Sequence, residues 1–220
     1  MAADARSGGK VRTTVVFDLG GVLISWNPRN LYRKLFPGDD AAMEQFLGTI
    51  CTQDWNERQD AGRSFAEAEA ELIALHPSKA ELIRAFGSRF DEMIPGALDD
   101  VVAILAELKQ RRVPLFALSN WSAETFPPQR RRFPFLGWFE GIVVSGEEGV
   151  IKPDQRIFER LVQRYRVRPE TAVFIDDNPG NAEASARLGF HGIHFTSATA
   201  LRTELASLGL LPSAGHAAAS

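Results

Sequence analysis

The sequence has one cysteine and no marked excess of either charge. The single thiol, Cys51, excludes an internal disulfide and offers no cysteine cluster for zinc. The formal net charge over the 220 residues is only −3 at pH 7. A chain without an overall basic field is not expected to recruit nucleic acid.

Long hydrophobic runs are also missing. No apolar run approaches the roughly 20 residues that are needed to span a bilayer, and residues 1–10 lack the apolar segment of a signal peptide. We therefore expect a cytoplasmic protein without a membrane partner. Residues 1–10 and 213–220 are expected to be disordered tails. No pattern favours a monomer over a homodimer.

What is present suits a folded protein with a sizeable core. Hydrophobic residues make up 45% of the chain, which is ordinary for a globular protein. A chain of this length suits one domain, or a core domain with a modest insertion.

The first strand signal ends on a carboxylate. The β-branched and aromatic run 14–17 predicts a buried strand, and Asp18 follows it directly. Gly20 and Gly21 would allow a tight turn and a close approach of the backbone to a ligand. An aspartate in this position is a candidate nucleophile. An Asx turn would explain an isolated Asp-x-Gly-Gly sequence equally well.

A helical segment follows this strand. Residues 27–93 show helical patterns and no convincing strand; Asp39 or Asp40 can cap one helix, and the spacing of Ser64 and Glu67 is that of a capping box. The simplest account is an α-helical cap subdomain, residues 26–94, inserted into a core domain. That core domain would consist of residues 11–25 and 95–212.

Helix and strand signals alternate after residue 95, which predicts a parallel sheet with right-handed crossovers. The further strands are expected at 114–118, 141–145, 171–175 and 192–195. Polar residues lie at or just past the end of several strands, and such ends share one edge of a parallel sheet, where ligands bind. These residues are Asp18, Ser119-Asn120, Lys152 and Asp176-Asp177.

These four sites resemble, in order, the motifs of the haloacid dehalogenase-like (HAD) hydrolase superfamily. The matching segments are Phe17-Asp18-Leu19-Gly20-Gly21-Val22, Leu118-Ser119-Asn120, Lys152-Pro153 and Phe174-Ile175-Asp176-Asp177-Asn178. The resemblance covers residues 13–196. It implies a Rossmannoid α/β fold, in which a parallel sheet lies between two helical layers (α/β/α). It also implies that the inserted helices form a cap of the C1 type.

Charge points to a metal at this edge. Asp18, Asp176 and Asp177 bring three negative charges, and Lys152 brings one positive charge. Buried like charges are costly, and a divalent cation would relieve the excess. Oxygen ligands favour Mg²⁺. The resemblance implies that the backbone carbonyl of Gly20 is a further ligand.

The resemblance also implies roles in phosphoryl transfer. Asp18 would attack phosphorus and form an aspartyl-phosphate that water then cleaves. Ser119 and the backbone N–H of Asn120 would hold a phosphoryl oxygen, with Gly21 allowing close approach. Lys152 would neutralise developing charge. The implied function is an Mg²⁺-dependent phosphatase that hydrolyses a small phosphorylated metabolite, for example a sugar phosphate.

One departure from the family pattern concerns Gly20, where most phosphatases of the superfamily carry a second aspartate. General acid–base help of that kind is worth roughly 10²–10⁴ in rate. Three explanations remain open. The leaving group is a good one, as in an anomeric sugar phosphate or an acyl phosphate; a cap acid such as Asp54, Glu57 or Asp60 substitutes; or the reaction is not phosphoryl transfer.

Two alternative functions follow. The first is a metal-free 2-haloacid dehalogenase that uses Asp18 to displace halide, which leaves without a proton. Against it, Asp176 and Asp177 would repel a carboxylate substrate. The second is a non-catalytic or weakly active HAD-like binding module.

Three further residues are candidates for substrate contact. Trp121 directly follows the Ser119-Asn120 motif and is expected to line the pocket. Trp55 and Arg58 are the candidates from the cap.

Overall fold

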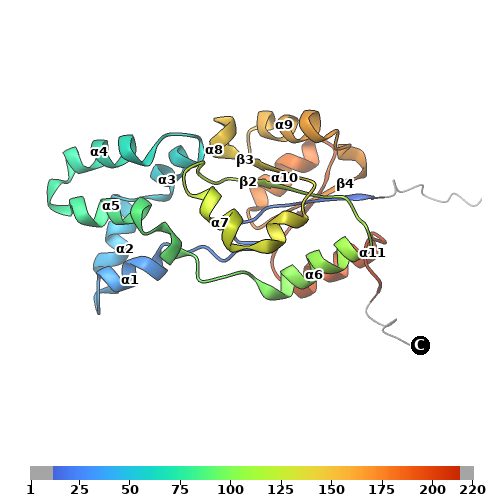
Figure 1. Ribbon diagram of the computed structural model, residues 1–220, viewed down its shortest axis with the longest axis horizontal. Helices are drawn as coiled ribbons and strands as arrows, with labels where there is room; N and C mark the ends of the chain where they lie inside the picture. Colours follow the sequence, from blue (N-terminus) through green and yellow to red (C-terminus); the bar gives the residue numbers. More distant parts are fainter. Residues whose placement is uncertain (1–11, 214–220) are drawn as a thin grey trace, which may run out of the picture.

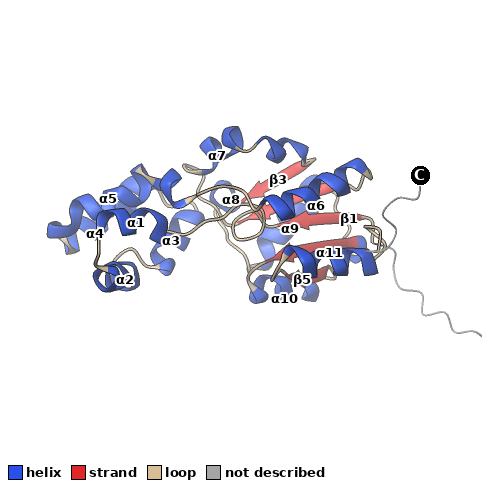
Figure 2. Ribbon diagram, turned by 90° about the horizontal axis from the view of Figure 1, so that it is seen from below, coloured by secondary structure: helices blue, strands red, loops and turns tan. Residues whose placement is uncertain are grey.

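The protein, described by a computed structural model over residues 12–213, contains a parallel five-stranded sheet (Figure 2). The strands lie in the order β3-β2-β1-β4-β5. Their bounds are β1 (Thr14–Phe17), β2 (Leu115–Ser119), β3 (Gly141–Val144), β4 (Ala172–Asp176) and β5 (His191–His194). The predicted α/β fold is confirmed. The predicted tails, residues 1–10 and all but the first residue of 213–220, lie outside the described residues.

Helices cover both faces of the sheet and give three layers (Figure 1). The central strand alternates between two apolar cores, because successive side chains of a strand point to opposite faces. Val15 and Phe17 pack in the cluster that includes α6 and α11, whereas Val16 packs in the cluster that includes α9 and α10. These helices are α6 (Asp99–Gln110), α9 (Gln155–Tyr165), α10 (Pro179–Arg187) and α11 (Ala198–Ser207).

Further short helical elements lie in the segments that connect the strands. The segment after β2 contains α7 (Phe126–Arg132) and the 3₁₀ helix η3 (Pro134–Trp138), and α8 (Ser145–Glu148) follows β3 directly. A further 3₁₀ turn, η4 (Pro169–Thr171), precedes β4.

Residues 26–94 lie between β1 and α6, and all their regular secondary structure is helical. We call this segment the helical insertion. It lies beyond the carboxyl ends of the strands (Figures 1 and 2). Its elements are α1 (Arg29–Leu35), α2 (Asp40–Thr49), α3 (Gln53–Asp60), α4 (Phe65–Leu75), η1 (Pro77–Lys79), α5 (Ala80–Ser88) and η2 (Phe90–Met93).

Local sequence signals account for several of these helix starts. The Asp39 side chain accepts a hydrogen bond from the backbone N–H of Ala42 at 2.9 Å, and caps α2. Ser64 Oγ accepts from the N–H of Glu67 at 3.2 Å, and caps α4 as the capping-box spacing predicts.

The two chain segments that join the insertion to the sheet run side by side. Leu98 donates its N–H to the carbonyl of Leu23 at 2.9 Å, and Ser25 donates to Gly96 at 3.0 Å. This double connection places the insertion directly over the edge of the sheet at which β1 ends.

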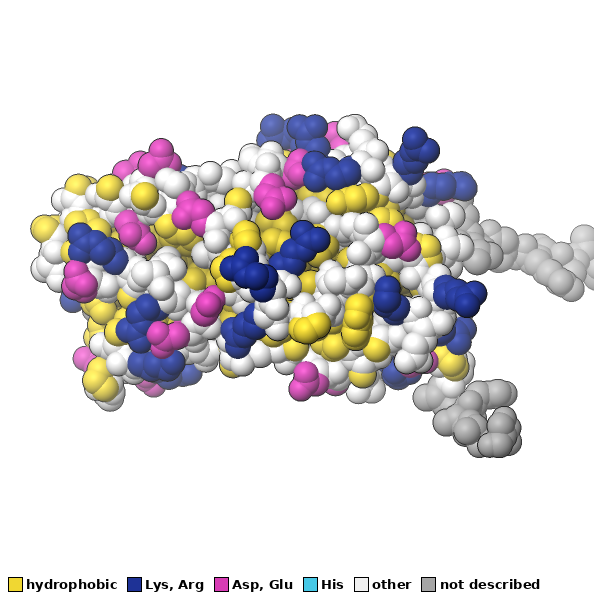
Figure 3. Space-filling view, in the orientation of Figure 1, with side chains coloured by type: hydrophobic (Ala, Val, Ile, Leu, Met, Phe, Trp, Pro, Cys, Tyr) yellow, Lys and Arg dark blue, Asp and Glu magenta, His cyan; other side chains and the backbone are white. Residues whose placement is uncertain are grey.

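The surface agrees with the balanced composition. Acidic and basic side chains are interspersed on the face shown in Figure 3. None of the helices in the described part of the chain is long and apolar enough to cross a bilayer.

Candidate active site

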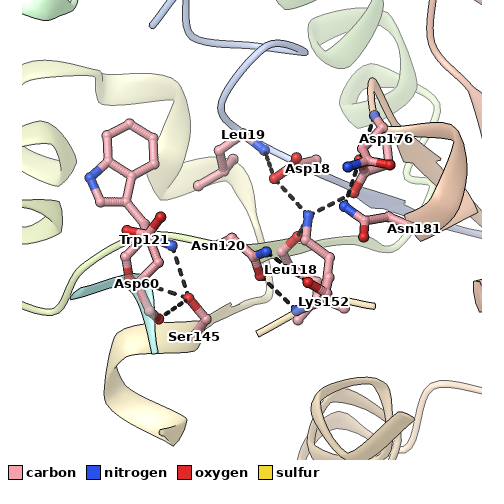
Figure 4. Close-up of polar contacts among 11 residues, drawn as sticks. Asp18, Leu19, Asp60, Leu118, Asn120, Trp121, Ser145, Lys152, Asp176 and Asn181 are labelled. Atoms are coloured by element: carbon pink, nitrogen blue, oxygen red, sulfur yellow. Dashed lines mark hydrogen bonds and ion pairs between the residues drawn. The ribbon is translucent and has the colours of Figure 1, made fainter. Parts of the chain in front are cut away.

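The polar residues that follow the strands meet around the ammonium group of Lys152 (Figure 4). Lys152 Nζ lies 3.0 Å from Asp18 Oδ1 and 2.7 Å from Asp176 Oδ2. It also donates a hydrogen bond to the carbonyl of Leu118 at 2.9 Å. Lys152, Asp18 and Asp176 are all buried. The convergence at one sheet edge that the sequence predicts is therefore present.

Lys152 is held in its charged form. Burial alone would lower its pKa, but the carboxylates of Asp18 and Asp176 outweigh this effect and raise the pKa of the ammonium group. Loss of either carboxylate would therefore weaken the charge that Lys152 supplies to the site.

The carboxylates, in contrast, are crowded. Burial raises the pKa of Asp18 to about 7, against the attraction of Lys152. Burial and the neighbouring Asp176 also raise the pKa of Asp177. Three carboxylates facing one ammonium group leave two negative charges without a partner. The net negative charge of this group favours the binding of a cation.

These carboxylates form a group that could hold a metal ion. One oxygen from each of Asp18, Asp176 and Asp177 lies within 4.8 Å of the others. Such a set of hard oxygen donors suits Mg²⁺, which binds through a few carboxylates and keeps several waters. Gly20 lines the same cavity as Asp18 and Asp177. The residues present therefore fit a magnesium site.

Asp176 is fixed by the start of the next helix. Its Oδ1 accepts hydrogen bonds from the N–H of Asn178 at 2.9 Å and from Nδ2 of Asn181 at 3.0 Å. Asn178 in turn caps α10 by accepting from the N–H of Gly180 at 2.8 Å. The cap of a core helix thus also orients a candidate metal ligand.

Asn120 joins the loop after β2 to the loop that carries Lys152. Its Oδ1 accepts from the backbone N–H of Lys152 at 2.8 Å, and its Nδ2 donates to the Lys152 carbonyl at 3.0 Å. Ser119 is buried next to Asp18, where it helps to lower the pKa of that carboxyl. Its hydroxyl completes no hydrogen bond of normal geometry within the described residues. Ser119 lies below the cavity that Asp18 lines, and it is not one of the residues that line it.

A cavity of about 250 Å³ opens above these groups. From the sheet edge it is lined by Asp18, Gly20, Gly21, Asn120, Trp121, Asp177, Asn178 and Asn181. From the helical insertion it is lined by Trp26, Gln53, Asn56, Glu57, Asp60 and Phe90. Trp121 is thus in the wall, where the sequence places it, and the candidate site lies between the insertion and the sheet.

One face of α3 supplies most of the insertion's contribution. Positions 53, 56, 57 and 60 are neighbours on a helix surface and all line the cavity. Trp55 and Arg58, the predicted substrate contacts, are on other faces. Trp55 is buried inside the insertion, with its ring centroid 5.1 Å from that of Phe86, and Arg58 is exposed. The structure places both away from the cavity.

Two functional candidates carry little signal in the sequence. Asn56 is a buried polar residue in the cavity wall. Its place there depends on the orientation of α3, which the sequence does not indicate. Ser145 is fully buried and bonds across the insertion boundary: its hydroxyl donates to the carbonyl of Asp60 at 2.6 Å. The sequence offers one indication for Ser145: like Asp18 and Ser119, it is a polar residue at the end of a strand.

The chain is similar in sequence to known proteins. The family model "haloacid dehalogenase-like hydrolase" matches residues 13–189. The sesquiterpene phosphatase astK of Aspergillus oryzae is 28% identical over 197 residues, which are 88% of this chain and 94% of that protein.

Solved structures agree on the fold. A HAD-family enzyme of Bacteroides thetaiotaomicron, in a magnesium complex, aligns with a TM-score of 0.62 and 21% identity over 82% of this chain and 91% of the other. L-2-haloacid dehalogenase of Xanthobacter autotrophicus, with chloropropionic acid covalently bound, aligns with a TM-score of 0.60 and 18% identity over 91% and 85%. Because the family model spans most of the chain and the motifs converge as described, this protein belongs to the haloacid dehalogenase-like hydrolases.

Proposed function

We propose that this hydrolase is an Mg²⁺-dependent phosphatase that cleaves a small phosphorylated metabolite through an aspartyl-phosphate. The observation that carries the proposal is the excess of two negative charges among Asp18, Asp176, Asp177 and Lys152, of which Asp18 and Asp177 line the cavity. A dianionic phosphoryl group would enter such a site only together with a cation. The similarity to a known phosphatase over nearly its whole length supports the same chemistry.

The residues at the floor suit the two halves of the reaction. An Asp18 oxygen would attack phosphorus in line, and the leaving oxygen would depart on the opposite side. Ser119 and the N–H of Asn120 would hold a phosphoryl oxygen, while Lys152 would offset the charge that develops. Bound Mg²⁺ would supply charge neutralisation and orientation of the phosphoryl oxygens. Water would then cleave the aspartyl-phosphate and restore Asp18.

We further propose that residues 26–94 act as a cap over a core of residues 11–25 and 95–212. Six insertion residues line the upper part of the cavity, opposite Asp18. Closure of this cap over a bound phosphate would exclude bulk water and strengthen the electrostatic interactions in the site.

The dehalogenase alternative fits the charges less well. A haloacid substrate carries a carboxylate, which would meet Asp176 and Asp177 beside the attacking Asp18. Like charges at such short range oppose binding unless a cation is present. The likeness to the solved dehalogenase concerns the fold, which both chemistries share.

The deciding experiment is a paired assay on purified protein. Phosphate release from a panel of phospho-sugars and nucleotides is expected with Mg²⁺ and is expected to stop when EDTA removes the metal. Halide release from 2-chloropropionate is expected to be absent. Halide release that EDTA does not affect, without any phosphate release, would show that the dehalogenase assignment is correct.

Gly21 provides an independent test of the metal site. It has a φ of +76°, and a Cβ at this position would overlap the Asp177 carboxylate. Gly21→Ala would therefore displace a proposed ligand, and we expect the apparent Mg²⁺ affinity to weaken by about 10–100-fold, as for other changes that misorient metal ligands. The dependence of phosphate release on Mg²⁺ concentration measures this affinity.

Gly38→Ala is the matched control. Gly38 has a φ of +77°, nearly the same backbone conformation, but a Cβ added there would meet nothing within 4 Å. Both variants should lose similar stability from backbone strain, about 1–2 kcal/mol. Only Gly21→Ala should require more Mg²⁺. Equal Mg²⁺ requirements in the two variants would argue against Asp177 as a ligand.

A further inference from the structure

The proposed reaction lacks an obvious proton donor at the sheet edge. An alkoxide is a poor leaving group unless it is protonated as the bond to phosphorus breaks. Gly20, beside Asp18 in the cavity wall, has no side chain to give that proton. Lys152 is engaged with two carboxylates and a carbonyl. A donor must therefore come from elsewhere in the cavity.

Helix α3 brings acidic residues to the opposite wall. Asp54 is exposed and does not line the cavity, whereas Glu57 and Asp60 do. Asp60 is the last residue of the helix. Its Oδ2 accepts a hydrogen bond from Nδ2 of the buried Asn56 at 3.0 Å. The carboxyl group of Asp60 is thus oriented by a neighbour that lines the same cavity.

The backbone of Asp60 is also fixed by the core domain. Its carbonyl accepts a hydrogen bond from Ser145 Oγ at 2.6 Å, and the same oxygen of Ser145 accepts from the N–H of Trp121 at 2.9 Å (Figure 4). Two residues further on, Gly62 packs so closely on Gly146 that a Cβ would lie 3.2 Å from its carbonyl oxygen. The end of α3 therefore packs on α8, which follows β3, and α8 is in turn joined to the loop after β2.

This docking links the insertion to the floor of the cavity. Trp121 directly follows Asn120, which holds Lys152 through two hydrogen bonds. A chain of short contacts thus runs from Lys152 through Asn120 and Trp121 to Ser145 and Asp60. The position of the Asp60 carboxyl relative to Asp18 is therefore set by the loops of the sheet as well as by the insertion.

Resting on the proposed phosphatase function, we propose that Asp60 is the general acid and base of the reaction. When Asp18 forms its bond to phosphorus, the bond from phosphorus to the leaving oxygen breaks, and that oxygen takes its electron pair and the Asp60 proton. Water then attacks phosphorus and gives a proton back to the Asp60 carboxylate. The Asp18–phosphorus bond breaks, which releases inorganic phosphate and restores both carboxyl groups.

The electrostatic surroundings of Asp60 agree with this role. Burial and the nearby Glu57 raise its pKa to about 7, and Asp18 across the cavity adds to the effect. A hydrogen bond from the backbone of Ser122 acts in the opposite direction. A group with such a pKa can both hold and accept a proton near neutral pH, which is what an acid that becomes a base requires.

The test compares two esters in wild type and Asp60→Asn. Glycerol 2-phosphate has a leaving group that needs a proton, whereas p-nitrophenolate leaves without one. We expect D60N to lower kcat for glycerol 2-phosphate by about 10²–10⁴-fold. With p-nitrophenyl phosphate, the first burst of nitrophenolate should form at the wild-type rate, and only the later turnover should slow, because cleavage of the aspartyl-phosphate still needs the base.

The pH dependence of kcat/KM provides a second test, because it would not change if Asp60 had only a structural role. Since the acid must be protonated, kcat/KM of the wild type on glycerol 2-phosphate should fall as pH rises through about 7. That limb should be absent in D60N. Asp54→Asn, at an exposed position of the same helix, is the control and should keep wild-type rates and the limb.

Three outcomes would overturn the proposal. If D60N slows the nitrophenolate burst by the same factor as glycerol 2-phosphate turnover, Asp60 has no role specific to the leaving group. If Glu57→Gln shows the selective loss and D60N does not, the proton comes from Glu57. A wild-type protein that releases no phosphate from either ester in Mg²⁺ would overturn the phosphatase function itself, and the role of Asp60 with it.

Discussion

Replacing Asp18 with asparagine is expected to reduce phosphate release by at least about 10⁴-fold, the scale seen when a nucleophile is removed. The amide of asparagine is a poor nucleophile and cannot form an aspartyl-phosphate. The loss should appear in kcat at saturating substrate and Mg²⁺, because the attack on phosphorus is the step that disappears. It should be the same for esters with good and poor leaving groups, in contrast to D60N.

The stability of the D18N variant separates this loss from unfolding. Burial raises the pKa of Asp18 despite its contact with Lys152, so the charged form is held at a cost in the metal-free fold. The Tm of D18N in EDTA should therefore equal or exceed that of wild type. Asp54→Asn, at an exposed position, should keep both activity and Tm. An inactive D18N protein with a much lower Tm would point to a structural role for Asp18 instead.

The residues at the sheet edge could be predicted because short stretches of sequence indicate where each strand lies. Most strands are short apolar runs, and Asp18, Ser119 and Asp176 lie at or just past the end of such a run. Lys152 is more distant, because α8 separates it from the end of β3. The parallel arrangement follows from the alternation of strands with helices, and it brings Asp18 and Asp176 to one edge without any knowledge of side-chain packing. The predicted strand 141–145 is shorter in the structure because Ser145 begins α8.

The wall formed by the insertion could not be predicted in the same way. Which face of α3 lines the cavity depends on how the helix packs against α8, the helix that follows β3. Successive residues of a helix are rotated by about 100° about its axis. Trp55, which the sequence predicts as a substrate contact, therefore points away from the cavity, and its neighbour Asn56 lines it. The same docking distinguishes Asp60 from Asp54, although both are acidic residues of one short helix.

The segment after β2 shows a second limit. Residues 121–140 have no clear helical period, yet they contain α7 and η3. Both helices begin with proline near the first position, which suits a helix start but also a turn. Their apolar residues, such as Phe126 and Leu136, are buried against the main core. Tertiary packing, which is not visible in a short window of sequence, decides between the two structures.

The charge balance leads to a second large expected effect, at Lys152. Lys152→Met keeps a side chain of similar length but leaves the buried carboxylates of Asp18 and Asp176, and the exposed carboxylate of Asp177 beside them, without a cation. Removing one partner of a buried ion pair typically costs about 3–5 kcal/mol in the free energy of unfolding. The rate of phosphate release should also fall, since Lys152 would no longer offset the negative charge that develops during phosphoryl transfer. Urea unfolding in EDTA measures the first effect.

Mg²⁺ should recover much of this stability and little of the activity. The metal would bind the same carboxylates and relieve their repulsion, and a ligand that binds only the folded state stabilises it by mass action. It would not replace the hydrogen bonds from Lys152 Nζ to Asp176 and to the carbonyl of Leu118. Lys79→Met, at an exposed position, should change neither quantity. A K152M protein as stable in EDTA as wild type would mean that the three carboxylates do not repel one another in the folded state, and the argument for a bound cation would lose its physical basis.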